Sequence, residues 1–164
     1  MTGQDSTERA LSQLIVTVFR LNGAISSWGD RLGEPLELST ARWQAMGAIR
    51  LAGTPLTAPQ IARAMGLTRQ GVQKQLNFLL EKGFVERRRN PLHERSHLYE
   101  LTEAGDAVYG EILERYTSQS NSALAGLDRE TLVSLQERLQ ILTDNIETLP
   151  ARIRRQGADD WSDE

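Results

Sequence analysis

The chain has 164 residues, of which 39% are apolar and 25% are charged, so it is long enough for one folded domain with its own core. No apolar run approaches the ~18 residues that span a membrane, and the polar first residues lack the apolar segment of a secretory signal. The absence of cysteine excludes disulfides, thiolate metal sites and thiol redox switches. These features predict a cytoplasmic protein without a membrane partner.

Charge is distributed unevenly along the chain. The net charge is −3, which on its own disfavours a nucleic-acid partner. Between Thr57 and Glu100, however, there are eight basic and four acidic residues, so this segment carries +4 and the remainder carries −7. A basic middle between acidic ends indicates a local DNA-contacting module, although chance clustering on a solvated face would give the same count.

A long amphipathic helix is predicted over residues 10–34, after a flexible N-terminus at residues 1–9. Its apolar residues alternate steps of three and four, which is the seam of a helix that packs against another helix. Proline follows the helix and cannot continue it. A second helix should begin after Ser39 and end at Gly53. The seam positions are Leu11, Leu14, Val18, Leu21, Ile25, Trp28 and Leu32.

Two short helices are predicted next. Thr57 and Gln60 have the spacing of a capping box, which predicts a helix over residues 58–65. A glycine ends this helix, and Thr68 is a suitable cap for a second one that continues to Gly83. The two helices and the glycine turn between them have the layout of a helix-turn-helix.

A hairpin and further helices complete the predicted elements. Residues 84–101 change to a strand-like pattern, with two short antiparallel strands joined by a tip of roughly six residues around Asn90 and Pro91. Helices are predicted again over residues 103–149, and the last of them has a second heptad-like apolar stripe. Residues 150–164 are predicted to be disordered.

The order helix, turn, helix, hairpin is that of a winged helix-turn-helix. We therefore predict a mainly α-helical fold with about six helices, one β-hairpin wing and a DNA-binding domain over residues 36–102. The long helices at 10–34 and 103–149 would pack together in a homodimer. A two-fold axis would then place two reading helices ~34 Å apart on a pseudo-palindromic site in double-stranded DNA.

The outward face of the second helix carries residue types that read DNA. Arginine and glutamine form bidentate hydrogen bonds with guanine and adenine, while lysine and threonine suit phosphate. No acidic residue occurs between Leu67 and Leu80, whereas a merely solvated face usually alternates charge signs. The predicted DNA contacts on this helix are Thr68, Arg69, Gln70, Gln73 and Lys74.

The stretches LTAPQIARAMGLTRQGVQKQLNFLLEKGFVERR, NPLHERSHLYELT and TEAG resemble the DNA-binding region of the MarR (multiple antibiotic resistance regulator) family. The resemblance implies a homodimeric transcriptional regulator, usually a repressor, that releases its operator when a small phenolic or hydrophobic effector binds. Arg95 corresponds to the family's wing arginine, which would enter the minor groove. His93 stands where the family commonly has an aspartate that holds this arginine. Thr57 and Arg88 complete the predicted DNA contacts, and no effector-binding residue is predicted.

The segment from His93 to His97 matches the H-E-x-x-H pattern of zinc metalloproteases, which requires a helix to bring both histidines to one metal. In a strand-like segment these histidines would lie some 13 Å apart at ~3.3 Å per residue, too far for one zinc ion. Because no other catalytic motif is present, we expect no metal, no cofactor and no enzymatic activity. The alternative function is a winged-helix module that binds proteins without DNA.

Overall fold

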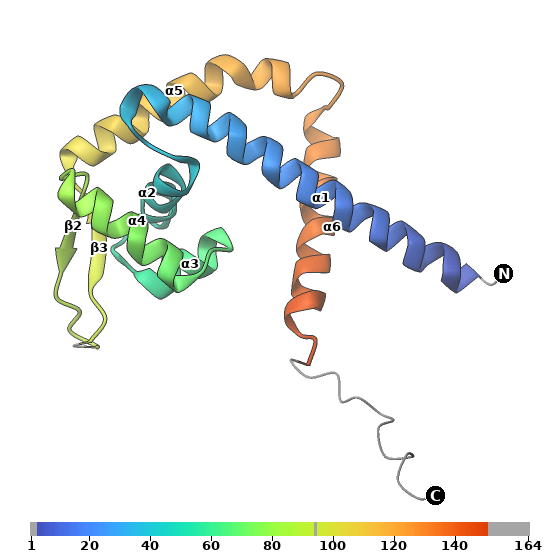
Figure 1. The fold of residues 1–164 in the computed structure, drawn as a ribbon, viewed down its shortest axis with the longest axis horizontal. Coiled ribbons are helices and arrows are strands. Elements are labelled where there is room, and N and C mark those ends of the chain that lie inside the picture. Colours follow the sequence, from blue (N-terminus) through green and yellow to red (C-terminus); the bar gives the residue numbers. More distant parts are fainter. Residues whose placement is uncertain (1–2, 94, 151–164) are drawn as a thin grey trace, which may run out of the picture. The chain divides into compact units, whose positions relative to one another are not determined.

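The computed structural model describes residues 3–93 and 95–150 (Figure 1). The described part forms two compact units, within residues 1–119 and 120–164. The mainly helical winged-helix fold predicted above is confirmed, and no described helix is long and apolar enough to cross a membrane. The elements are α1 (Gly3–Gly33), the 3₁₀ turn η1 (Glu34–Leu36), α2 (Thr40–Ala52), β1 (Leu56–Thr57), α3 (Ala58–Met65), α4 (Arg69–Glu81), β2 (Val85–Arg88), β3 (Leu98–Leu101), α5 (Glu103–Ala123) and α6 (Arg129–Glu147).

The first helix is longer than predicted. α1 begins at Gly3, within the residues 1–9 that the sequence assigned to a flexible N-terminus. Apolar spacing could not detect this extension because the residues there are polar, although glutamate and arginine favour helices. Helix α1 ends at Gly33, as predicted. The predicted disordered tail lies outside the described residues from residue 151 onward.

The start of α2 is held by α1. Ser39 is the N-cap residue, as predicted, but its side chain makes no capping hydrogen bond. Instead, Asp30 Oδ1 accepts from the backbone N–H of Thr40 at 2.7 Å, and Thr40 Oγ1 donates to the carbonyl of Ser26 at 2.7 Å. A side chain from a neighbouring helix thus replaces the local cap, which satisfies an N–H that would otherwise lack a partner.

The helix-turn-helix has the predicted bounds and caps. Gln60 Oε1 accepts from the backbone N–H of Thr57 at 2.8 Å, which closes the capping box at the start of α3. Gly66 ends α3 in the left-handed conformation, with φ of 62°. Thr68 Oγ1 then accepts from the N–H of Gly71 at 3.0 Å and caps α4.

The wing is part of a three-stranded antiparallel sheet with the order β1-β3-β2, rather than an isolated hairpin. Strand β3 is central, because Tyr99 pairs with Leu56 of β1 on one side and with Arg87 of β2 on the other. The sequence did not predict β1, because a strand of two residues is too short to show an alternating pattern. The loop between β2 and β3 spans residues 89–97, which is longer than the predicted tip.

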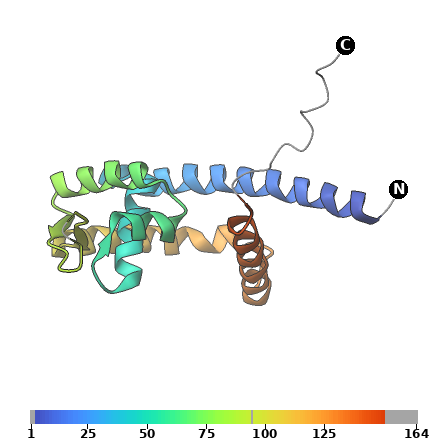
Figure 2. The ribbon, with the colours of Figure 1, turned by 90° about the horizontal axis from the view of Figure 1, so that it is seen from below.

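The core lies where α2, α3, α4, α5 and the sheet meet. Within the first unit, Figures 1 and 2 show these elements gathered at the C-terminal end of α1. Thr102 joins the sheet to α5, because its N–H donates to the carbonyl of Phe84 at 3.1 Å and its Oγ1 accepts from the N–H of Gly105 at 3.0 Å. The largest fully buried side chains are Leu38, Met46, Ile61, Val72, Leu76, Leu79 and Ile112.

Two helices carry apolar stripes on their surfaces. The described part of the chain leaves the predicted seam of α1 between 36% and 51% exposed from Leu11 to Ile25, and it buries no residue of α6. The stripe of α6 includes Leu135, Leu139 and Ile146. Stripes with this spacing are typical of helices that pack against a partner helix.

Candidate nucleic-acid interface

The outer face of α4 consists of Thr68, Arg69, Gln70, Gln73 and Lys74, and all five residues are exposed. Their orientation follows from the opposite face of the helix, which is anchored by the buried side chains of Val72, Leu76 and Leu79. Within the described chain, the side chains of Arg69, Gln70 and Lys74 form no hydrogen bond or ion pair. These groups are therefore available to an external ligand.

A hollow of about 330 Å³ lies between α4, the start of α3 and the wing; we call it the α4–wing hollow. It brings together four of the predicted DNA contacts, three from α4 and one from the wing loop. Thr57, Lys74 and Arg88 are not among its lining residues. The lining consists of Ala58, Pro59, Arg69, Gln70, Gln73, Arg95, Ser96, His97 and Tyr99.

Two residues that the sequence did not single out contact Gln73 of the outer face. Gln73 Nε2 donates to Asn77 Oδ1 at 3.0 Å and to the hydroxyl of Tyr99 at 3.4 Å. Tyr99 is only 4% exposed and belongs to the central strand. The Asn77 contact joins positions i and i+4 of one helix, a spacing that sequence can indicate. The Tyr99 contact joins the wing to the helix and has no such signal.

Arg88 is separated from the other predicted DNA contacts. Side chains alternate along a strand, and the register places Arg87 opposite the buried Tyr99, so Arg88 lies on the other face of the wing. There its Nη2 pairs with Glu86 Oε1 at 3.0 Å and its Nε pairs with Glu100. The structure therefore places Arg87, rather than Arg88, on the wing face that is turned toward α4.

Glu86 and Glu100 lie directly opposite each other on β2 and β3. A hydrogen bond between the two carboxyl groups raises the pKa of Glu100 above its ordinary value of 4.5, and burial raises it further against the effect of Arg88. The same bond, together with Arg88, lowers the pKa of Glu86. The two pKa values move in opposite directions because the carboxyl groups face each other, and two facing carboxylates would repel.

This pair makes the stability of the wing depend on pH. The contribution of Glu100 to the free energy of unfolding is complete below pH 4.5 and is lost as pH rises through its raised pKa. The contribution of Glu86 is instead lost as pH falls through its lowered pKa. We expect Glu100→Gln, which cannot ionise, to gain unfolding free energy relative to wild type as pH rises above 4.5. Urea unfolding across this range measures the difference. Glu111→Gln, an exposed change on α5, is the control. A stability difference between E100Q and wild type that does not depend on pH would contradict the raised pKa of Glu100.

The wing loop does not have the geometry of a zinc protease. His93, Arg95, Ser96 and His97 lie in loop structure, whereas the H-E-x-x-H pattern requires a helix. Glu94 lies outside the described residues. The N–H of Ser96 donates to the carbonyl of His93 at 3.0 Å, so His93 shapes the loop through its backbone. No cluster of three metal-binding side chains occurs among the residues that the structure describes.

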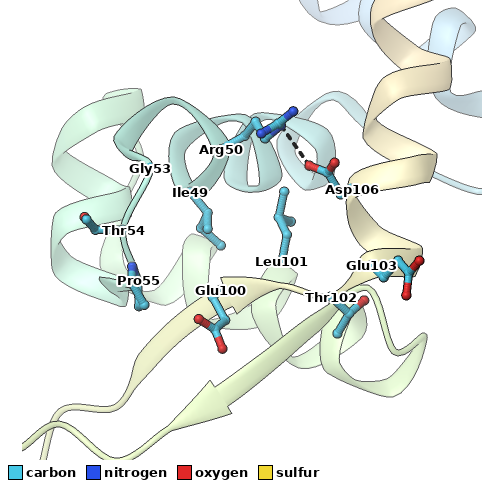
Figure 3. Close-up of a pocket in the computed structure, with 10 residues that line it drawn as sticks. All are labelled: Ile49, Arg50, Gly53, Thr54, Pro55, Glu100, Leu101, Thr102, Glu103 and Asp106. Carbon is cyan, nitrogen blue, oxygen red and sulfur yellow. Dashed lines mark ion pairs between the residues drawn. The ribbon is translucent and has the colours of Figure 1, made fainter.

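A second hollow, of about 340 Å³, lies between the end of α2, the turn at residues 53–55, the end of β3 and the start of α5 (Figure 3). Arg50 Nε pairs with Asp106 Oδ1 across it at 2.8 Å. Glu100 and Glu103 also line this hollow, so its described lining has three carboxylates and one guanidinium. This charge disfavours a phosphate partner, in contrast to the α4–wing hollow.

Comparison with known proteins agrees with this geometry. The MarR family model matches residues 36–96. An uncharacterized protein of Mycobacterium tuberculosis is 35% identical over 130 residues, which cover 79% of this chain and 90% of that protein. The transcriptional regulator BldR from Sulfolobus solfataricus superimposes with a TM-score of 0.68 at 23% identity, covering 91% of this chain and all of that one. A mutant MarR from E. coli, complexed with operator DNA, gives a TM-score of 0.63 at 23% identity, covering 78% and 94%.

A helix-turn-helix followed by a wing and flanked by long helices defines a winged helix protein. The chain belongs to the MarR family and has the fold of that family's transcription regulators.

Proposed function

We propose that this protein is a sequence-specific DNA-binding transcriptional regulator. The observation that supports this function best is the outer face of α4. There the side chains of Arg69, Gln70 and Lys74 are exposed and form no hydrogen bond or ion pair with the described residues. The α4–wing hollow adds Arg95 to the same surface. A helix with these side chains suits the major groove, and a nearby arginine on a loop suits the minor groove. Thr57 and Arg88 differ from these residues because they have partners within the protein: Thr57 Oγ1 donates to Gln60 Oε1, and Arg88 pairs with Glu86 and Glu100.

The regulator acts as a homodimer in this proposal. The exposed seam of α1 and the unburied stripe of α6 offer the apolar surface that a second copy would cover. Two-fold symmetry would place two α4 helices on successive major-groove faces, ~34 Å apart, and so require a pseudo-palindromic operator. Repression, and release by a small hydrophobic or phenolic effector, are proposed from the family resemblance. No enzymatic activity is part of the proposal.

The salt dependence of binding tests this function. Genomic fragments recovered with the purified protein would be labelled, and their affinity measured by fluorescence anisotropy at increasing salt. Each neutralised phosphate should contribute about −0.9 to the log–log slope. Sedimentation should show a dimer. Binding that is insensitive to salt would favour the protein-association module instead, and a monomer that binds no DNA would refute the proposal.

A further inference from the structure

One predicted base-reading residue is held in place by the wing. Gln73 is the member of the outer face of α4 whose amide donates both to Asn77 Oδ1, at 3.0 Å, and to the Tyr99 hydroxyl, at 3.4 Å. Arg69, Gln70 and Lys74 have no such bonds with the described residues. The orientation of Gln73 is therefore set before any ligand arrives.

These two bonds decide which atom of Gln73 remains available. A carboxamide has two N–H donors and one carbonyl acceptor. Both donors of Gln73 Nε2 are directed to protein acceptors, so Oε1 is left for an external partner. A glutamine that reads adenine in the bidentate manner needs a free N–H for N7 as well as a carbonyl for the amino group. Gln73 is thus equipped only to accept.

We propose that Tyr99 is a positioning residue that makes Gln73 select a base carrying an amino group. This inference rests on the proposed function, because it assigns a specificity to the same surface. In the major groove the donors are the N6 amino group of adenine and the N4 amino group of cytosine, whereas guanine and thymine present acceptors there. At one position of each half-site, the strand contacted by Gln73 should therefore carry adenine or cytosine.

Tyr99 is suited to this task by its place in the sheet. It is 4% exposed and is paired on both sides, with Leu56 and with Arg87. Its ring is therefore held by packing and by two neighbouring strands, and its hydroxyl accepts from Gln73, which also lines the α4–wing hollow. Removing the hydroxyl alone, in Tyr99→Phe, retains the ring and frees one N–H of Gln73.

The test is the base preference of Tyr99→Phe, measured by selecting DNA from a library randomised over the operator half-site. Wild type should favour adenine and cytosine at one position, and this preference should fall about fivefold or more in the variant. Affinity for unrelated DNA and the thermal midpoint should not change. Tyr109→Phe, the same change at another buried tyrosine of the first unit, is the matched control and should leave every preference intact.

A double-mutant cycle separates the possible results. Gln73→Ala should remove the same preference, and adding Tyr99→Phe to it should have no further effect. If wild type selects a sequence but Tyr99→Phe selects it equally well, the positioning role is refuted while the proposed function stands. A uniform loss of affinity across all sequences would make Tyr99 merely structural and also refute it. If wild type selects no sequence, the proposed function itself fails.

Discussion

Gly105→Ala is expected to lower the free energy of unfolding by about 3 kcal/mol, although alanine is ordinarily the better residue within a helix. A Cβ atom at this position would lie 1.9 Å from the carbonyl oxygen of Phe84 and 2.8 Å from its carbonyl carbon. Both are backbone atoms and cannot rotate away. The same carbonyl accepts from the N–H of Thr102, so moving it would disturb the joint between the sheet and α5.

Gly110→Ala is the matched control for this prediction. It lies on the same helix, and a Cβ there would meet nothing within 4 Å. The added methyl group should stabilise α5 by about 0.5–1 kcal/mol, because glycine loses more conformational freedom on folding. Urea unfolding followed by circular dichroism, at one fixed protein concentration, measures both variants. Two variants that change stability in the same direction would contradict the close approach at Gly105.

Arg69→Ala is expected to abolish most of the preference for the operator over unrelated DNA. Arg69 is the first residue of α4, is exposed and lines the α4–wing hollow without an internal partner in the described chain. A bidentate contact between arginine and guanine contributes ~1–3 kcal/mol of discrimination, which is about fivefold or more for each half-site. Arg95→Ala should instead weaken binding more evenly across sequences, because the minor groove carries less base information.

Competition between the operator and unrelated DNA at constant salt distinguishes these two effects. Arg50→Ala is the control for loss of a positive charge. Arg50 lies on α2, outside the α4–wing hollow, and its pair with Asp106 is about half exposed, so its loss should change stability little. Affinity and preference that remain at wild-type values in both the Arg69 and Arg95 variants would refute the assignment of this surface to DNA.

The elements that sequence predicted well are those whose ends carry their own chemical signal. Thr57, Gln60 and Thr68 mark the caps of α3 and α4, and the structure has each helix within the predicted bounds. The start of α1 was misplaced because it has no apolar residue to mark it. Strand β1 was missed because its two residues acquire their role only from pairing with β3, which lies about 40 residues further along the chain.

The candidate site was predicted in its helical part and less well in its wing. The spacing of buried residues fixes which side of α4 is exposed, so the outer face could be derived from sequence. For the run of three arginines, the faces could not be assigned from sequence because the start of the strand was not known. Once β2 is known to begin at the buried Val85, alternation places Arg87 on the same face as Val85 and Arg88 on the opposite face. The contact between Tyr99 and Gln73 spans 26 positions and depends on tertiary packing.

Strand β3 forms backbone hydrogen bonds with β1 on one side and with β2 on the other, and β1 is followed directly by α3. The paired strands at the base of the wing are therefore connected directly to the helix-turn-helix. The described loop residues 89–93 and 95–97 lie outside strand pairing. We expect insertions or substitutions in that loop to change how far Arg95 extends without shifting the register that holds Tyr99. Under the proposed function, relatives that keep this register would keep the base preference, while changes in the loop would adapt Arg95 to operators of different groove width.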